Sequence, residues 1–185
     1  MSNRTLHLTE QLIACRSVTP DDGGCQDLIR ERLAPLGFSF ETLVSGPDDF
    51  RVTNLWALRR GSDAKAPLLA FAGHTDVVPT GPRERWASDP FVPTHRDGRL
   101  YGRGAADMKG FLACVLALVP ELTAARLRKP AILAFSYDEE VGCKGAPALV
   151  DDLLRNLPPP EACLVGEPTL LRLIDGHKGK AGFRC

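Results

Sequence analysis

The sequence predicts an α/β fold in which helices flank a mostly parallel central sheet. Three segments, "PLLAFAG" (67–73), "AILAFSY" (131–137) and "ACLVG" (162–166), are short, continuous apolar runs of the kind that form fully buried strands. Segments with a helical spacing of apolar residues lie between these runs. Because strands that alternate with helices are typical of parallel sheets with both faces covered, we expect one layered α/β domain.

Two amphipathic helices are expected to open the chain. The first covers residues 8–15 and the second covers residues 25–36, and both repeat apolar side chains at helical spacing. Asp21 or Asp22 can cap the start of the second helix, and Gly37 can end it.

The remaining elements follow from the same two periodicities. Residues 38–44 and 51–60 alternate apolar and polar side chains, which predicts half-buried strands. Residues 112–119 and 146–157 have the spacing of helices, and a loop rich in Pro and Gly is expected at residues 79–98.

The composition argues against two classes of partner. Lys plus Arg and Asp plus Glu number 23 each, so no net charge attracts the chain to nucleic acid or to an anionic membrane. The longest apolar run, residues 111–119, is far shorter than the ~20 residues that cross a bilayer, and the N-terminus lacks an apolar signal core. We therefore expect a cytoplasmic protein. The six cysteines are scattered without a CxxC pair, and we expect reduced, buried thiols rather than disulfides.

Residues that commonly bind metals follow each buried strand. His74 and Asp76 come after the first, Glu139 and Glu140 after the second, and Glu167 after the third. In open α/β sheets, ligands bind in the crevice beyond the carboxyl ends of the strands, so these side chains are expected to converge. One imidazole with several carboxylates is a ligand set suited to zinc, and also to cobalt or manganese.

A further carboxylate, Asp107, lies at the predicted start of the helix that contains residues 112–119, where the helix dipole favours an anion. His74 and Asp76 are two residues apart on an extended segment and therefore share a face. Asp76 can thus accept the second ring N–H of His74 and fix its tautomer, as metal-bound histidines usually require.

Glu139 and Glu140 are adjacent, so their side chains point in different directions. One carboxylate can therefore bind a metal while the other takes a proton from water. Metal-assisted hydrolysis needs this division, because a free carboxylate must take a proton from water and pass it to the leaving amine.

Two nucleotide-binding motifs are incomplete. In "GRGAADMKG", Asp107 occupies the third glycine position of a dinucleotide fingerprint and would repel a pyrophosphate. In "GHKGKA", Ile174 and Ala181 replace residues that a P-loop requires. His7 and His95 are interpreted as surface residues, and His177 as either a loop residue or a substrate contact.

Four motifs, "GHTDVVP", "LYGRGAADMKG", "YDEEVGCKGAP" and "GEPT", together resemble the M20 family of metallopeptidases and deacylases in order and spacing. The resemblance implies a zinc-exopeptidase-like catalytic domain and two divalent ions, zinc or cobalt. It also implies ligand roles for four residues: His74 and Glu167 on one ion, Asp107 bridging both, and Glu140 on the second. The same resemblance makes Asp76 the orienting residue and Glu139 the general base and acid, and it implies a cis peptide at Asp107–Met108.

Within the family, "SDPFVP", "FSYDEEVGCKGAP" and "HKGK" resemble the acetylornithine deacetylases of arginine biosynthesis more than the succinyl-diaminopimelate desuccinylases. The expected reaction is therefore removal of the acetyl group from N-acetyl-L-ornithine, with His177 as a substrate contact. A desuccinylase, another M20 deacylase or dipeptidase, and a non-enzymatic metal-binding module stay open as alternatives.

The resemblance also implies that this chain is a part of a longer protein. Residues 1–177 would form the N-terminal part of the catalytic domain and residues 178–185 the start of a lid and dimerisation domain. The second histidine ligand would then lie beyond residue 185, the complete protein would be a homodimer acting on a small N-acyl amino acid, and this chain alone would be inactive.

Overall fold

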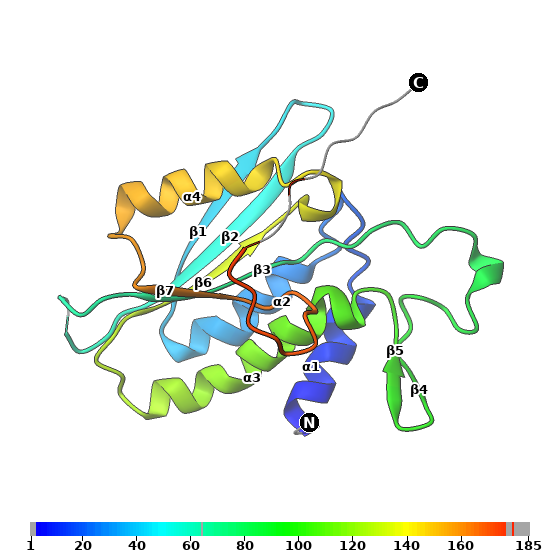
Figure 1. Ribbon diagram of the computed structural model, residues 1–185, viewed down its shortest axis with the longest axis horizontal. Coiled ribbons are helices and arrows are strands. Elements are labelled where there is room, and N and C mark those ends of the chain that lie inside the picture. The colour runs from blue at the N-terminus through cyan, green and yellow to red at the C-terminus, as the bar shows by residue number, and fades with distance from the viewer. Residues whose placement is uncertain (1–2, 64, 177–178, 180–185) are drawn as a thin grey trace.

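A central five-stranded sheet lies between two helical layers in the computed structural model, which describes residues 3–63, 65–176 and 179 (Figure 1). Three helices cover one face and one helix covers the other. The α-helices are α1 (Asn3–Ala14), α2 (Cys25–Leu33), α3 (Gly110–Ala124) and α4 (Gly145–Asn156). The sheet strands are β1 (Ser39–Ser45), β2 (Val52–Arg59), β3 (Leu69–His74), β6 (Ala131–Ser136) and β7 (Ala162–Val165).

The sheet is mixed, with the strand order β1-β2-β6-β3-β7. Strands β6, β3 and β7 pair in parallel, whereas β1 pairs with β2 and β2 pairs with β6 in the antiparallel sense. It follows that β2 alone runs against the other four strands of this sheet. The predicted α/β fold with helices on both faces is confirmed, and the antiparallel part arises because a hairpin joins β1 to β2 at one edge.

Strand alternation divides the core between the two faces of the sheet. On the face covered by α1, α2 and α3, Leu55 of β2 and Leu133 of β6 pack against helix residues such as Leu12 and Leu112. The neighbouring strand residues point to the opposite face, where they pack against α4. This second core is smaller, and the indole N–H of Trp56 ties β2 to α4 through a hydrogen bond to Asp152 (2.9 Å).

The predicted helix signals have the expected structural roles. Asp22 accepts a hydrogen bond from the backbone N–H of Gln26 in the first turn of α2 (3.0 Å). After α2, a short 3-10 turn at Ala34–Leu36 ends at Gly37, whose φ of 76° is in the left-handed region that glycine favours.

The segment expected to be an irregular loop contains part of a small hairpin. Strand β4 (Thr94–Arg96) pairs antiparallel with β5 (Arg99–Tyr101) around a turn at Asp97 and Gly98. The sequence analysis did not predict this hairpin, because its strands have three residues each and no apolar alternation long enough to detect.

The face of the sheet near α4 and β7 is open to solvent. All four residues of β7 are exposed, and a mainly apolar cavity of about 240 Å³ lies between α4 and the neighbouring strands. The predicted lid segment, residues 178–185, lies outside the described residues apart from Gly179. No helix in the described ranges has both the length and the apolar character to cross a membrane.

The five described cysteines are free thiols, as expected. Burial was predicted correctly only for Cys25. Cys15 is partly exposed, and Cys114, Cys143 and Cys163 are exposed.

Candidate metal centre

The carboxyl ends of the parallel strands β3, β6 and β7 lie at one edge of the sheet, where the predicted ligands converge. His74 is the last residue of β3, and its side chain is 1% exposed. Its Nδ1–H donates to the backbone carbonyl of Asp76 (3.0 Å). Because Nδ1 is committed to this carbonyl, Nε2 is the nitrogen that can meet a ligand.

Three carboxylates surround Nε2 of His74. The nearest oxygens are Asp107 Oδ1 at 3.0 Å, Glu139 Oε2 at 3.9 Å and Glu167 Oε1 at 3.9 Å. Among the residues that the structure describes, His74, Asp107 and Glu167 form a group whose possible ligand atoms all lie within 4.8 Å of one another. The second oxygen of Glu139, Oε1, accepts a hydrogen bond from the thiol of Cys143 (3.5 Å).

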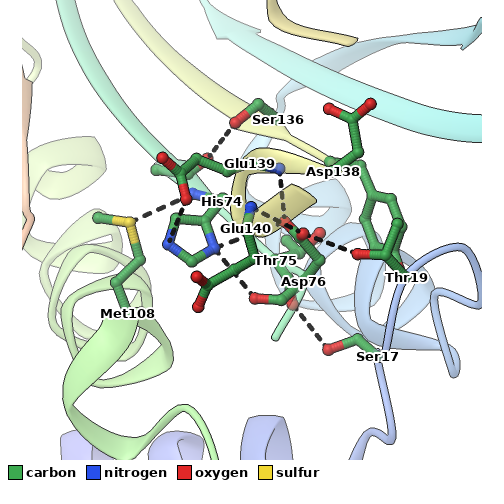
Figure 2. A network of polar contacts seen from close by, with 12 residues as sticks. Ser17, Thr19, His74, Thr75, Asp76, Met108, Ser136, Asp138, Glu139 and Glu140 are labelled. Carbon is green, nitrogen blue, oxygen red and sulfur yellow. Dashed lines mark hydrogen bonds and ion pairs between the residues drawn. The ribbon is translucent and has the colours of Figure 1, made fainter. Parts of the chain in front are cut away.

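Asp107 reaches this position through a distorted turn before α3. Gly104 starts the turn with φ 79°, a conformation in which an added side chain would also meet Val77. The peptide bond between Asp107 and Met108 is cis, as the family resemblance implied. The sulfur of Met108 accepts a hydrogen bond from the backbone N–H of His74 (3.3 Å), which joins the turn to β3 (Figure 2).

Glu167 follows β7 at the point where the strand passes α3. The residue before it, Gly166, lies so close to Phe111 of α3 that a β-carbon on Gly166 would be 1.9 Å from the ring. The absence of a side chain at position 166 therefore lets the end of β7 approach α3 and brings Glu167 to His74.

Asp76 joins the histidine to the turn that carries the glutamates. Its carboxylate is fully buried, lies 3.5 Å from Nδ1 of His74 and accepts the backbone N–H groups of Glu139 (3.2 Å) and Glu140 (3.3 Å). The sequence predicted that the carboxylate of Asp76 orients the ring of His74. In the structure, the backbone carbonyl of Asp76 is nearer to Nδ1 of His74 than the carboxylate of Asp76 is. The carboxylate instead organises the turn after β6.

A loop between α1 and α2 holds Asp76 from the other side, and the sequence analysis did not identify it. The hydroxyl of Thr19 donates to Asp76 Oδ2 (2.8 Å), and the hydroxyl of Ser17 donates to the carbonyl of Thr75 (2.7 Å) (Figure 2). The backbone N–H of Val77 completes the contact by donating to the carbonyl of Ser17 (2.9 Å). The sequence around Ser17 and Thr19, just before Pro20, contains no motif that indicates this role.

Buried side chains also support the turn after β6. Asn54 accepts a hydrogen bond from the backbone N–H of Tyr137 (2.9 Å), and Asp138 accepts one from the N–H of Gly145 at the start of α4 (2.9 Å). Asp138 has φ 68°, which turns the chain sharply before Glu139. Of the three consecutive acids at 138–140, Asp138 is therefore structural, while the other two face the site.

The electrostatics of the site favour a positive charge at its centre. Burial opposes protonation of His74, but the hydrogen bond and charge of Asp76 and the carboxylate of Asp107 outweigh it and raise the pKa of His74 to about 9. Burial, followed by the negative charge of Asp107, raises the pKa of Glu140. Burial raises the pKa of Glu167, the charge of His74 opposes this shift, and the charges of Asp107, Glu139 and Glu140 add to it.

The predicted ligands are only partly brought together. His74, Asp107 and Glu167 share one site, whereas the carboxylate of Glu140 is not within the group of mutually close atoms. Glu140 still lies near enough to Asp107 and Glu139 to be affected by their charges. The predicted substrate contact His177 lies outside the described residues.

The donor set fits a divalent cation. One neutral imidazole nitrogen and several carboxylate oxygens are the ligands that zinc accepts. Neighbouring acids add to the raised pKa values of Glu140 and Glu167, and the charge of His74 opposes both shifts. A cation would remove this repulsion.

The chain is similar to curated proteins that are named succinyl-diaminopimelate desuccinylases. The chain is 55% identical to succinyl-diaminopimelate desuccinylase of Methylibium petroleiphilum over 187 residues, which covers 97% of the chain and 48% of that protein. It is also 55% identical to succinyl-diaminopimelate desuccinylase of Cupriavidus necator over 184 residues, with the same two coverages. The chain thus spans about half the length of the curated relatives it matches.

Solved structures show the same fold at lower identity. Human carnosine dipeptidase 1 matches 87% of this chain with a TM-score of 0.75 and 23% identity, over 37% of its own length. The M20 family metallo-carboxypeptidase Sso-CP2 from Sulfolobus solfataricus matches 90% of this chain with a TM-score of 0.76 and 20% identity, also over 37% of its own length. The family model for peptidase family M20/M25/M40 matches residues 70–177, which include His74, Asp107 and Glu167. The chain belongs to peptidase family M20/M25/M40.

Proposed function

We propose that the complete protein is a metal-dependent amide hydrolase that removes the succinyl group from succinyl-diaminopimelate. The observation that carries the hydrolase proposal is the convergence of Asp107, Glu139 and Glu167 on Nε2 of His74, with separations of 3.0 to 3.9 Å. The choice of substrate rests on the desuccinylases that are 55% identical to this chain. These relatives favour the alternative that the sequence analysis kept open over removal of acetyl from N-acetylornithine.

Two divalent ions, zinc or cobalt, are proposed as the cofactors. His74 and Glu167 would hold one ion, Asp107 would bridge both, and Glu140 would hold the second. The mutual proximity of His74, Asp107 and Glu167 supports the first assignment, and the charge interaction between Glu140 and Asp107 supports the second. Bound ions of this kind polarise a substrate carbonyl and lower the pKa of water.

Glu139 is proposed as the general base and acid. Its Oε2 faces His74 Nε2 across 3.9 Å, and its backbone N–H is fixed by Asp76, so the carboxylate is held beside the ligands. It would take a proton from water and deliver it to the amine that leaves when the amide bond breaks. Asp76 acts through other residues, because it holds both the ring of His74 and the turn that carries Glu139.

The proposed domain division stays as expected from the sequence: residues 1–177 as part of a catalytic domain and residues 178–185 as the start of a lid and dimerisation domain. A second histidine ligand from the remaining half of the protein and a homodimer are part of the same proposal. Since the chain spans 48% of its relatives, we expect the 185 residues alone to lack activity.

The test is a hydrolysis assay of the complete protein, loaded with zinc or cobalt, against succinyl-diaminopimelate and N-acetylornithine. We expect kcat/KM to be at least about tenfold higher for the succinyl substrate, a typical discrimination by one binding group. Chelation of the metal should abolish the reaction, and added metal should restore it. A preference for N-acetylornithine would overturn the substrate assignment, and no hydrolysis of either substrate by the metal-loaded protein would contradict the hydrolase.

A further inference from the structure

Another cavity lies at the end of the sheet opposite the candidate metal centre. Its volume is about 290 Å³, and it lies between the end of β2, the start of β6 and the last turns of α3. Arg59, the last residue of β2, pairs in the sheet with Ala131, the first residue of β6. His74, by contrast, is the last residue of β3, and Glu167 follows β7. Because β3, β6 and β7 are parallel, this cavity and the candidate metal centre are separate sites.

Two short basic segments meet at this cavity. The segment "RRGS" (59–62) ends β2, and the segment "RLRK" (126–129) connects α3 to β6. They are far apart in the chain, and the pairing of β2 with β6 brings them to one place. Arg59, Arg60, Arg126 and Lys129 all line the cavity, whereas no described Asp or Glu does.

Backbone hydrogen bonds join the two segments that form the walls of the cavity. The N–H of Ser62 donates to the carbonyl of Leu127 (3.1 Å), and the N–H of Asp63 donates to the carbonyl of Arg128 (3.3 Å). The guanidinium group of Arg128 also donates to the carboxylate of Asp63 (2.9 Å). Gly61 lies so close to this partner that a β-carbon on it would be 2.0 Å from the carbonyl oxygen of Arg128. The cavity is therefore bounded by packed backbone rather than by one free loop.

Three of the four cations at the cavity have no acidic partner. Lys129 forms an ion pair with Glu161. Among the residues that the structure describes, no carboxylate pairs with Arg59, Arg60 or Arg126. Nη1 of Arg59 donates to the carbonyl of Arg60 (3.1 Å), and Nε of Arg59 is buried without a hydrogen-bond partner. The fold thus gathers like charges whose repulsion an anion would relieve.

The rest of the cavity lining is mainly apolar. Val119 and Leu133 are buried in the main core, and Phe38 and Leu122 are partly buried. The hydroxyl of Thr123, which also lines the cavity, donates to the carbonyl of Val119 (3.0 Å) and keeps its oxygen free to accept. Sites for small molecules usually combine apolar walls with a few polar groups in a volume of roughly 300–1,000 Å³. The volume of this cavity is close to the lower limit, which favours a small ligand with an apolar body and a charged group.

We propose that this cavity binds a small organic phosphate. The guanidinium groups would hold the phosphoryl oxygens through paired N–H donors, and the apolar walls would surround the organic part. Three unpaired cations suit a dianion better than a single carboxylate, because the attraction grows with the charge of the ligand. The carbonyl groups at the end of α3 carry about half a negative charge, which is less than the charge of the arginines. The proposal does not depend on which substrate the protein hydrolyses.

Titration calorimetry with phenyl phosphate tests the proposal on the complete protein, from which a chelating resin has removed the metal. Metal is removed because a phosphate would also bind to metal ions at the candidate metal centre. Inorganic phosphate is the probe without an apolar body, and phenol is the probe without a charge. We expect saturable binding of phenyl phosphate with a Kd below about 1 mM, at least about tenfold weaker binding of inorganic phosphate, and no measurable binding of phenol.

Single variants locate the binding site. Arg126→Met changes an exposed position, and Arg59→Met keeps the apolar stem of the side chain. Each should weaken the binding of phenyl phosphate by about tenfold or more, because hydrogen bonds from a charged donor are lost. The matched control, Arg85→Met, removes an equal charge from an exposed position in the 3-10 turn Arg83–Arg85 and should bind as the unmodified protein does. Circular dichroism shows whether each variant is folded.

Chemical protection provides a measurement that needs no variant. Phenylglyoxal modifies accessible arginine side chains, and mass spectrometry of the digest identifies the modified positions. Phenyl phosphate at about ten times its Kd should slow the modification of Arg126 by about tenfold, because roughly nine sites in ten are then occupied. The modification of Arg85 should proceed at the same rate with and without phenyl phosphate.

Three results would overturn the proposal. The first is a folded protein that shows no saturable binding of phenyl phosphate with a Kd below about 1 mM. The second is similar affinity for phenyl phosphate and inorganic phosphate, which would indicate a charged surface without an apolar site. The third is binding that neither Arg59→Met nor Arg126→Met weakens, or that leaves the modification of Arg126 unchanged, since the phosphate would then lie elsewhere.

Discussion

The two halves of the candidate metal centre differ in how the protein holds them. His74 and Asp76 have side chains that are 1% and 0% exposed, and hydrogen bonds fix both. Asp107, Glu139 and Glu167 have side chains that are 48%, 37% and 41% exposed and meet mainly each other and the imidazole. The fold therefore determines the position of the first half, whereas the second half is a set of like charges that a cation would organise.

This difference shows where stability and function conflict. The buried half adds to the stability of the fold, because each polar group has a partner in a region of low dielectric. Burial and the neighbouring carboxylates raise the pKa values of Glu140 and Glu167, so the ionised form of each glutamate is destabilised in the metal-free protein. Substitutions in the two halves should therefore have opposite effects on stability.

The largest expected effect is on catalysis by Glu139, in the exposed half. In the complete protein, Glu139→Gln should lower kcat by roughly 10²–10⁴-fold, the usual size of a general acid–base contribution, while metal content stays near normal. Steady-state kinetics and metal analysis measure the two quantities. The control is Glu41→Gln on β1, an exposed carboxylate that should change neither. Loss of metal in Glu139→Gln would reassign Glu139 as a ligand.

The next effect is on stability, in the buried half. Asp76→Ala removes the acceptor for Thr19 and for two backbone N–H groups, and it removes the buried carboxylate that lies 3.5 Å from Nδ1 of His74. We expect the free energy of unfolding to fall by about 3 kcal/mol, the cost of breaking a buried, hydrogen-bonded charge pair. Urea denaturation in the presence of a chelator measures it, with Asp76→Asn as the variant that keeps one acceptor oxygen. A loss below about 1 kcal/mol would mean that Asp76 does not organise this half.

A smaller loss is expected from the loop that supports Asp76. Thr19→Val keeps the shape of the side chain and removes the hydroxyl that donates to Asp76. The free energy of unfolding should fall by about 1 kcal/mol, the usual value of one hydrogen bond, and Thr19→Ser should restore most of it. Equal stabilities of the Val and Ser variants in the same urea experiment would show that this hydrogen bond is not formed in solution.

The smallest effect should have the opposite sign. Glu167→Gln removes a charge that burial and the neighbouring carboxylates disfavour, so the metal-free chain should become more stable by up to about 0.5 kcal/mol after solvent screening. With zinc present, the same variant should be less stable than the unmodified chain, because a ligand is lost. Glu121→Gln on α3, an exposed position, is the control for a change of net charge. Destabilisation by Glu167→Gln in the absence of metal would contradict the proposed repulsion.

Apolar patterns predicted most of the fold. The runs at 67–73, 131–137 and 162–166 became β3, β6 and β7, and the segments of helical spacing became the four helices. They succeeded because burial leaves a periodic signal along the chain. The hairpin of β4 and β5 left no such signal, since none of the residues in its two strands is buried.

The site was predicted less completely than the fold. The positions of His74 and Glu167 follow from the rule that strand ends converge, and Asp107 was predicted from its place at the start of a helix. The contact between Thr19 and Asp76 joins residues 57 positions apart, and no local pattern marks either partner. Similarly, adjacency predicted that Glu139 and Glu140 diverge, but not that Glu139 would be the one beside His74 Nε2.

The close approach of Gly166 to Phe111 has a consequence for how this sequence can vary. A methyl group at position 166 would overlap the ring, so the end of β7 would have to move away from α3 and take the next residue with it. In a library of all single substitutions, position 166 should accept only glycine. A larger residue at position 166 should be accepted only in a double variant that also has a smaller residue at position 111. The two positions would then vary as a pair, although neither carries a group that takes part in chemistry.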